Sequence, residues 1–434
     1  MRNTGESGGY ATIRAMSSRY PPVQGPDGPA DPRRRLLLEL GAGLLSGGLP
    51  VHDVEEELRR LGRALAAPDA RIAALTTGLF VALDADDATV FEPVGPALRF
   101  EQTADILDLV HRLRAGGLDG HRALRDLDSI RRAPARWPAW VADLGMLPVG
   151  VGLCLYLQPV LANVVAAAIG SLIVMGLTMT ARRLPLLRPL LPVTAGFLVS
   201  VVVLGAARAS LLDGPLRTIV ATLAILLPGG LLVTGLSEIA AGAASAGTAR
   251  LVSGSVQLAL FLTGVVAAVT ATGSPPSVLA NTEVAKPGWW VICLGLALAV
   301  AGVVINVNTP PPAIPWIVAV ITVTAAVQVT VAAANGPAVG GLAGAVTAAT
   351  AATVAHWVRR GSSWQVLYLP AFWIVVPGSF GLLNTAQIEV GNGAQAVLTA
   401  VSALFGVSVG TLIGSVISRI PRPALRPRRA GAPE

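Results

Sequence analysis

The sequence predicts an all-α polytopic membrane protein of about ten transmembrane helices in two inverted five-helix repeats, preceded by a small α+β cytoplasmic domain. Three observations lead to this fold class. Of the 434 residues, 53% are hydrophobic and only 13% are charged, whereas soluble domains carry about 25% charged residues. The apolar residues form blocks of about 20 residues, the length that crosses a bilayer. A Pro-Gly pair recurs at Pro228-Gly229 and Pro377-Gly378, with 149 residues between the two prolines.

The charges divide the chain into two unlike regions. Residues 141–420 contain five acidic and ten basic side chains, whereas the whole chain has 25 acidic and 32 basic ones. The net charge of +7 is spread over the flanks of the apolar blocks and the tail. Basic residues at such places set membrane topology, so we do not expect a nucleic-acid partner. The two cysteines, Cys154 and Cys293, lie in apolar segments, which excludes a disulfide framework and a cysteine metal site.

The charged region is expected to fold as a small domain behind a disordered lead. Residues 1–33 are rich in Gly, Pro and Ser and contain no apolar run, as in disordered segments. Residues 34–135 are predicted to form the cytoplasmic α+β domain, because helical and strand patterns alternate there. The expected helices cover Leu36–Leu44, Val54–Leu65, Ile106–Leu113 and Leu118–Ile130, and the expected strands cover Ala73–Leu83 and Thr89–Phe91.

The apolar region is expected to cross the membrane ten times. The inside loops are more basic than the outside loops, so both termini are predicted to be cytoplasmic. Membrane repeat 1 spans 141–272, membrane repeat 2 spans 288–418, and 419–434 form a basic cytoplasmic tail. The ten predicted spans are 141–159, 160–180, 190–208, 217–236, 254–272, 288–307, 314–333, 337–357, 364–383 and 395–418.

The two Pro-Gly pairs indicate an internal repeat. Moving the starts of the first five spans by 149 residues places them near the starts of the last five. Five spans are an odd number, so the halves would have opposite orientations, as in many secondary transporters. Proline and glycine break helices, and paired breaks in two halves point to a substrate site near the midplane. The alternative is that both pairs are packing kinks.

One segment also resembles a known family. Leu226–Arg250 reads LLPGGLLVTGLSEIAAGAASAGTAR and is similar to the signature of the bacterial threonine/serine exporter family. The family often has Asp where this chain has Glu238. Further similarity lies in Gly41–Gly48 followed by Val54-Glu55, and in Val375–Ser379. The positions that match the signature are Pro228, Gly229, Glu238, Gly242, Gly247 and Arg250.

This resemblance implies a bacterial inner-membrane antiporter that exports threonine and serine at the expense of the proton-motive force. Its partners would be the small amino acid, protons and the lipid bilayer, with no cofactor or metal and with homo-oligomerisation left open. Some relatives are linked to dicarboxylate export, so a succinate-like exporter is the alternative, with Arg208 and Arg250 lining the path. A membrane-anchored sensor or hydrolase acting through the N-terminal domain is the alternative of another class. Ten spans exceed what an anchor requires, so we do not expect an enzyme.

Two acidic residues are candidates for the proton pathway. Charged side chains inside a membrane are costly and are commonly functional, and a carboxylate at Glu238 suits a proton carrier. The alternative for Glu238 is an interfacial acid paired with Arg250. Asp143 stands near the start of the first span. Its alternative role is an acid favoured by a helix N-terminus.

A zwitterionic hydroxy-amino acid needs three kinds of partner. The broken helices at Pro228-Gly229 and Pro377-Gly378 would offer N–H groups and carbonyls to its charged ends. Its hydroxyl needs a polar side chain. Each polar candidate can alternatively hold two helices together. The candidates are Ser379, Asn384, Thr234, Asn163 and Asn306.

Overall fold

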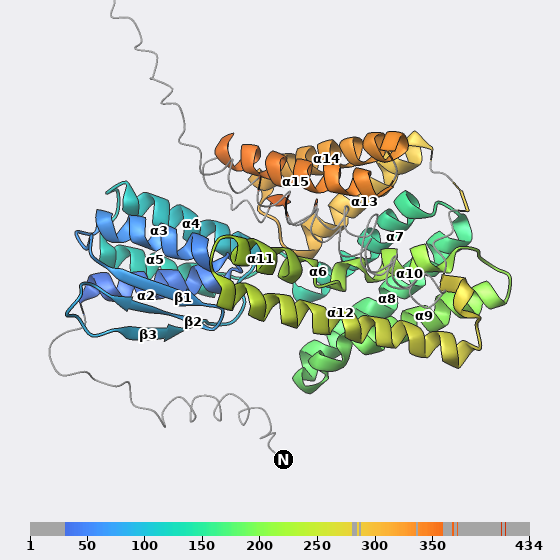
Figure 1. The fold of residues 1–434 in the computed structure, drawn as a ribbon, viewed down its shortest axis with the longest axis horizontal. Coiled ribbons are helices and arrows are strands. Elements are labelled where there is room, and N and C mark those ends of the chain that lie inside the picture. The colour runs from blue at the N-terminus through green and yellow to red at the C-terminus, as the bar shows by residue number, and fades with distance from the viewer. Residues whose placement is uncertain are drawn as a thin grey trace, which may run out of the picture.

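The computed structural model describes residues 31–279, 284–285, 288–335 and 337–358, with single positions at 367, 368, 371, 409 and 413. It contains a mixed helix and sheet unit next to a longer, helical unit (Figure 1). The predictions for most of the lead, for the last two spans and for the basic tail lie outside the described residues.

The N-terminal unit packs four helices against a three-stranded antiparallel sheet of order β1-β2-β3. The leucines of α2 are almost completely buried, and α3 buries one apolar stripe, so that a single apolar core joins the helices to the sheet. This arrangement follows the helical spacing of apolar residues in both segments. The elements are α2 (Pro32–Ser46), α3 (Val51–Ala64), β1 (Arg71–Leu75), β2 (Gly78–Ala82), β3 (Val90–Pro93), α4 (Phe100–Arg114) and α5 (Gly120–Arg132).

The expected strand Ala73–Leu83 is wrong, because the structure divides this run into β1 and β2. Leu75 pairs with Gly78 across a two-residue turn. A Cβ at position 78 would lie 2.3 Å from the Phe91 ring, so only glycine fits there. Thr76 and Thr77 occupy the turn, and threonine favours strands, which explains why the sequence did not show the hairpin.

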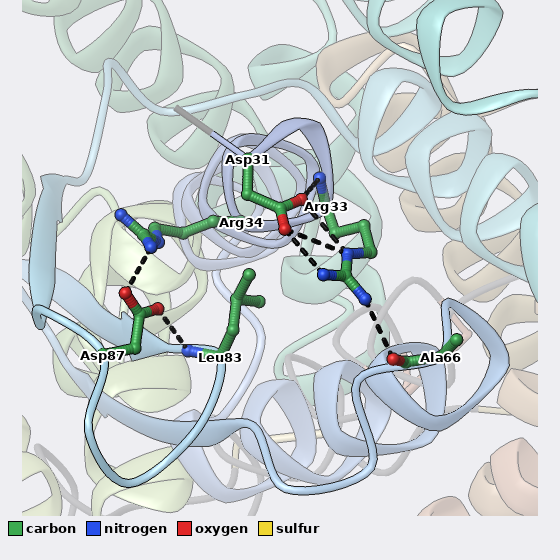
Figure 2. A network of polar contacts seen from close by, with 6 residues as sticks. All are labelled: Asp31, Arg33, Arg34, Ala66, Leu83 and Asp87. Atoms are coloured by element: carbon green, nitrogen blue, oxygen red, sulfur yellow. Dashed lines mark hydrogen bonds and ion pairs between the residues drawn. The ribbon is translucent and has the colours of Figure 1, made fainter. Parts of the chain in front are cut away.

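A polar network on the N-terminal unit holds the start of α2 (Figure 2). Asp31 caps α2 by accepting the Arg33 N–H at 2.8 Å, and Arg33 donates to the Ala66 carbonyl at 2.9 Å. Arg34 pairs with Asp87, which also accepts the Leu83 N–H at 2.9 Å. The Arg33 side chain lowers the pKa of Asp31, and the Leu83 N–H, with Arg34, lowers that of Asp87.

The second unit consists of apolar helices and makes this a multi-pass membrane protein. Among the residues that the structure describes, six helical segments are long and apolar enough to cross a bilayer, and a seventh is formed if α10, η2 and α11 are one bent span. Its helices are α6 (Ala139–Leu144), α7 (Met146–Leu157), α8 (Leu161–Arg183), α9 (Leu191–Arg208), α10 (Pro215–Leu223), α11 (Gly229–Ala240), α12 (Ala244–Thr272), α13 (Trp289–Asn306), α14 (Ile314–Asn335) and α15 (Pro337–Val358), with 3-10 turns η1 (Pro185–Leu190), η2 (Ala224–Leu226), η3 (Pro276–Leu279) and η4 (Pro311–Ala313).

The first eight predicted spans each coincide with helices of this unit. The fifth was predicted to start at 254, whereas α12 starts at Ala244. The additional turns, residues 244–253, contain Arg250, one threonine and two serines beside three alanines and one glycine. Their low mean hydropathy hid them from a search for apolar blocks. These turns are where α12 meets the N-terminal unit.

Glycines allow the membrane helices to approach closely. In α7 and α13 the contacts are reciprocal, because Gly145 faces Gly302 and Gly152 faces Gly295 in an antiparallel pair. A Cβ at Gly152 would lie 2.4 Å from the Gly295 carbonyl oxygen. Small residues are required for such contacts, since lipid supplies no hydrophobic force to join helices.

Candidate functional site

The span formed by α10, η2 and α11 is bent by 65° where η2 ends and α11 begins. Leu227 is extended, and Pro228 is the N-cap of α11 with no side-chain cap. The Leu226 carbonyl, freed by the break, accepts Gln257 Nε2 of α12 at 3.3 Å. The break therefore places a helix N-terminus inside the span, where its N–H groups attract negative charge.

Glu238 lies in the last turn of α11 and is completely buried. Its Oε2 is 3.0 Å from Arg250 Nε, and its Oε1 accepts the Val51 N–H at 2.9 Å. A turn at Gly242, whose φ of +91° suits glycine, brings α12 back beside α11. The ion pair between Glu238 and Arg250 is therefore present, about 15 Å along the helix from Pro228.

This ion pair also joins the membrane unit to the N-terminal unit. The N-cap of α3 is Pro50, which offers no side-chain acceptor, and the Glu238 carboxylate occupies that place at the positive end of the helix. Arg250 Nη2 lies 3.4 Å from the Leu49 carbonyl oxygen. Ala246 of α12 belongs to the apolar core of the N-terminal unit. The two units thus share both a polar and an apolar contact, and Figure 1 shows α11 and the start of α12 against the helices of the N-terminal unit.

Asp143 forms a separate ionic contact. It is 1% exposed, and its Oδ1 is 2.6 Å from Arg182 Nη2 at the end of α8. Beside it, Asn306 Nδ2 of α13 donates to the Ala142 carbonyl at 2.9 Å. These contacts join α6 to α8 and α13.

A third polar group lies where α7 ends and α8 and α10 begin. Gln158 and Asn163 are completely buried. Both donate to the backbone carbonyl of Asp213, at 3.4 and 2.8 Å, and Asn163 Nδ2 also lies 2.8 Å from Thr218 Oγ1. Asn163 Oδ1 has no hydrogen-bond partner among the described residues.

The candidates from the sequence thus fall into separate places. Glu238 and Arg250 meet, Asp143 lies elsewhere, and Pro228 and Gly229 form the break. Pro377, Gly378, Ser379 and Asn384 lie outside the described residues.

Sequence reasoning missed Val51, Leu49, Gln158 and Thr218. The segment Gly47–Val54 reads GGLPVHDV, which starts a helix without a Ser, Thr, Asp or Asn at the N-cap. A helix start without such a capping residue indicates that the N–H groups at the α3 N-terminus find their acceptor on another part of the chain. Thr218 carried no comparable signal, because threonine is common in membrane helices.

Comparison with known proteins identifies the family. The family model described as "Putative threonine/serine exporter" matches residues 35–272, which are more than half of the chain. The match includes the N-terminal unit, the bent span and the Glu238–Arg250 pair. Neither a curated protein nor a solved structure matches the chain. The chain belongs to the threonine/serine exporter family.

Proposed function

We propose that this protein exports threonine and serine across the bacterial inner membrane by proton-coupled antiport. The observation that carries the proposal is a family-specific segment that contains both a helix break at Pro228 and, on the same span, the buried Glu238–Arg250 pair. A break provides backbone groups for a small ligand, and a buried carboxylate provides a place for a proton.

The substrate would bind at the break. The first N–H groups of α11 would receive its carboxylate, because a helix N-terminus attracts anions. By the proposed repeat, Pro377-Gly378 would contribute carbonyls for the ammonium group. Ser379 and Asn384 would then be within the same half to receive the hydroxyl.

The contact between α7 and α13 supports two inverted halves. Gly145 and Gly295 are 150 residues apart, as are Gly152 and Gly302, and this matches the 149 residues between the two prolines. If Gly145 is replaced by its equivalent Gly295, and Gly302 by its equivalent Gly152, the contact Gly145–Gly302 becomes the contact Gly295–Gly152. A pseudo-two-fold axis in the membrane plane would require this relation. Alternating access would then move one half against the other.

Glu238 would couple proton uptake to the N-terminal unit. A protonated carboxyl group loses its ion pair with Arg250 and becomes a weaker acceptor for the Val51 N–H. Proton binding would therefore loosen the junction between the two units. In this mechanism the N-terminal unit, on the cytoplasmic side, acts as a gate, and Asp143 with Arg182 forms a second ionic contact of the pathway.

The test is efflux from proteoliposomes loaded with labelled threonine, serine or succinate, with and without a pH gradient. We expect threonine and serine efflux to accelerate with the gradient, and Glu238→Gln to lose that acceleration. Glu56→Gln is the matched control, because Glu56 is exposed and pairs only within α3. Efflux of succinate alone, or of nothing, would contradict the proposal.

The succinate alternative expects Arg208 and Arg250 to line the path, and a single dicarboxylate site would need both of them. Arg250 is already paired with Glu238 near the start of α12, whereas Arg208 donates to the carbonyl of Gly273 just past its end. The 23 residues between Arg250 and Gly273 rise about 35 Å in a helix. The two arginines therefore do not form a common dicarboxylate site.

A further inference from the structure

A cavity of about 550 Å³ opens at the end of α12 that is remote from the N-terminal unit. Figure 1 shows α9 and the far end of α12 on the side of the molecule away from the sheet. Cavities that hold small ligands have volumes of about 300–1,000 Å³, so this one accommodates a free amino acid together with water. Its described lining includes Arg208, Asp213, Gly214, Ser274 and Ser277.

The lining carries one group for each end of a zwitterion. Among the described residues of the lining, Arg208 and Asp213 are charged, and Ser274 and Ser277 carry hydroxyls. Arg208 Nη1 donates to the Gly273 carbonyl at 2.6 Å, which holds the guanidinium at the wall. A guanidinium has five N–H donors, so others remain for a ligand carboxylate.

The part of the lining that contains Asp213 is held by buried side chains. The backbone carbonyl of Asp213 accepts from both Asn163 and Gln158, which are completely buried. Gly214, at φ +60°, then directs the chain into α10. Two buried amides therefore fix the turn that presents the Asp213 carboxylate, which is itself exposed.

We infer that this cavity is a binding site for a free, zwitterionic hydroxy-amino acid on the side of the membrane opposite the N-terminal unit. Arg208 binds its carboxylate, Asp213 binds its ammonium group, and a serine binds its hydroxyl. The inference rests on the proposed export of such amino acids, and it adds the place from which they are released.

The charges of the lining select between the two substrate classes. A zwitterion complements one cation and one anion. The second carboxylate of a dicarboxylate would instead face Asp213, and like charges repel.

The test uses the full-length protein in vesicles whose lumen contains the N-terminal unit and labelled threonine. Unlabelled threonine outside drives exchange, and its half-saturating concentration is measured. We expect Arg208→Gln and Asp213→Asn to raise this concentration about ten-fold, since a charge-assisted contact of this strength corresponds to a factor of ten. Arg208→Lys should restore part of the affinity.

This binding test has matched controls and outcomes that would contradict the inference. The half-saturating concentration of threonine inside the vesicles should stay unchanged in both variants. Arg188→Gln replaces an exposed arginine in η1, just before α9, and should behave as the wild type. Wild-type outer affinity in both variants, or competition by succinate equal to that by threonine, would overturn the inference. If the wild type exchanges no threonine, the proposed function fails by itself. Equilibrium binding of labelled threonine to the purified protein then decides: binding that Arg208→Gln weakens supports the cavity, and absent or unaltered binding overturns it.

Discussion

The two ends of the membrane unit use the same kinds of side chain in opposite ways. At one end, Glu238 is completely buried and its partner Arg250 is only 15% exposed. At the other end, Arg208 and Asp213 are exposed and line an open cavity. A dry ion pair that loses one partner leaves an uncompensated charge, whereas exposed charges exchange partners with water at little cost. The comparison shows that burial, more than residue type, separates groups that hold the fold from groups available to a ligand.

The largest expected effect is the loss of the buried carboxylate. Glu238→Gln should lower the free energy of unfolding by about 3 kcal/mol, because Arg250 is left buried without its counter-charge and α3 loses its charged cap. Asp213→Asn should change it by less than about 0.5 kcal/mol. Unfolding of the purified protein in detergent measures both. If both substitutions changed the free energy of unfolding equally, burial would not distinguish the two ends of the membrane unit.

The second largest effect on stability is expected at the glycine contact between α7 and α13. Gly152→Ala should destabilise the protein by about 2 kcal/mol, because the new Cβ meets the backbone of Gly295 and Ala299 at 2.4 and 2.6 Å. Gly176→Ala is the matched control, since no heavy atom apart from the adjacent backbone of its own helix lies within 4 Å of its Cβ position. It should be neutral or slightly stabilising, because alanine favours helices. A tolerated Gly152→Ala would show that α7 and α13 are not closely packed.

A smaller effect is expected behind the outer cavity. Asn163→Leu should lower the free energy of unfolding by about 1–2 kcal/mol, because the Asp213 carbonyl and the Thr218 hydroxyl lose a buried donor. The same substitution should weaken outer threonine binding, as Asp213 is no longer held. Thr178→Val, which removes a hydroxyl bonded only within α8, serves as the control. If Asn163→Leu left the outer affinity for threonine unchanged, the buried amides would not position the lining of the cavity.

The smallest effect concerns the ion pair between Arg34 and Asp87 in the N-terminal unit, whose side chains are 18% and 19% exposed. Asp87→Asn should destabilise the protein at pH 7 by about 1 kcal/mol, because asparagine keeps an oxygen that accepts the Leu83 N–H and loses only the charge that faces Arg34. The Leu83 N–H and Arg34 hold the pKa of Asp87 below its ordinary value of 3.8, so its contribution to stability is present above pH 3.8 and is lost as the pH falls through the folded pKa. Stability curves of wild type and variant should therefore converge in acid. A constant difference at all pH values would contradict this assignment.

Much of the architecture could be predicted from local patterns. Apolar blocks located the helices that coincide with the first eight predicted spans, of which six, or seven with the bent one, are long and apolar enough to cross a bilayer. The helical spacing of leucines located α2 and α3. The Pro228-Gly229 pair marked the break, because proline lacks an N–H wherever it stands. The β1–β2 hairpin was missed because threonine occupies its turn. The early start of α12 was missed because residues 244–253 include Arg250, two serines and a threonine among small residues.

The sequence by itself determined that the chain is a multi-pass membrane protein with a charged N-terminal unit and that it resembles the exporters to which it belongs. Composition and periodicity are local properties, and they suffice for this. Only the tertiary structure decided that Glu238 caps α3 across 187 residues, that Asp143 pairs with Arg182, and that Arg208 and Asp213 line one cavity. Those contacts depend on how helices distant in sequence pack, because burial and pairing are set by neighbours that the local pattern does not contain.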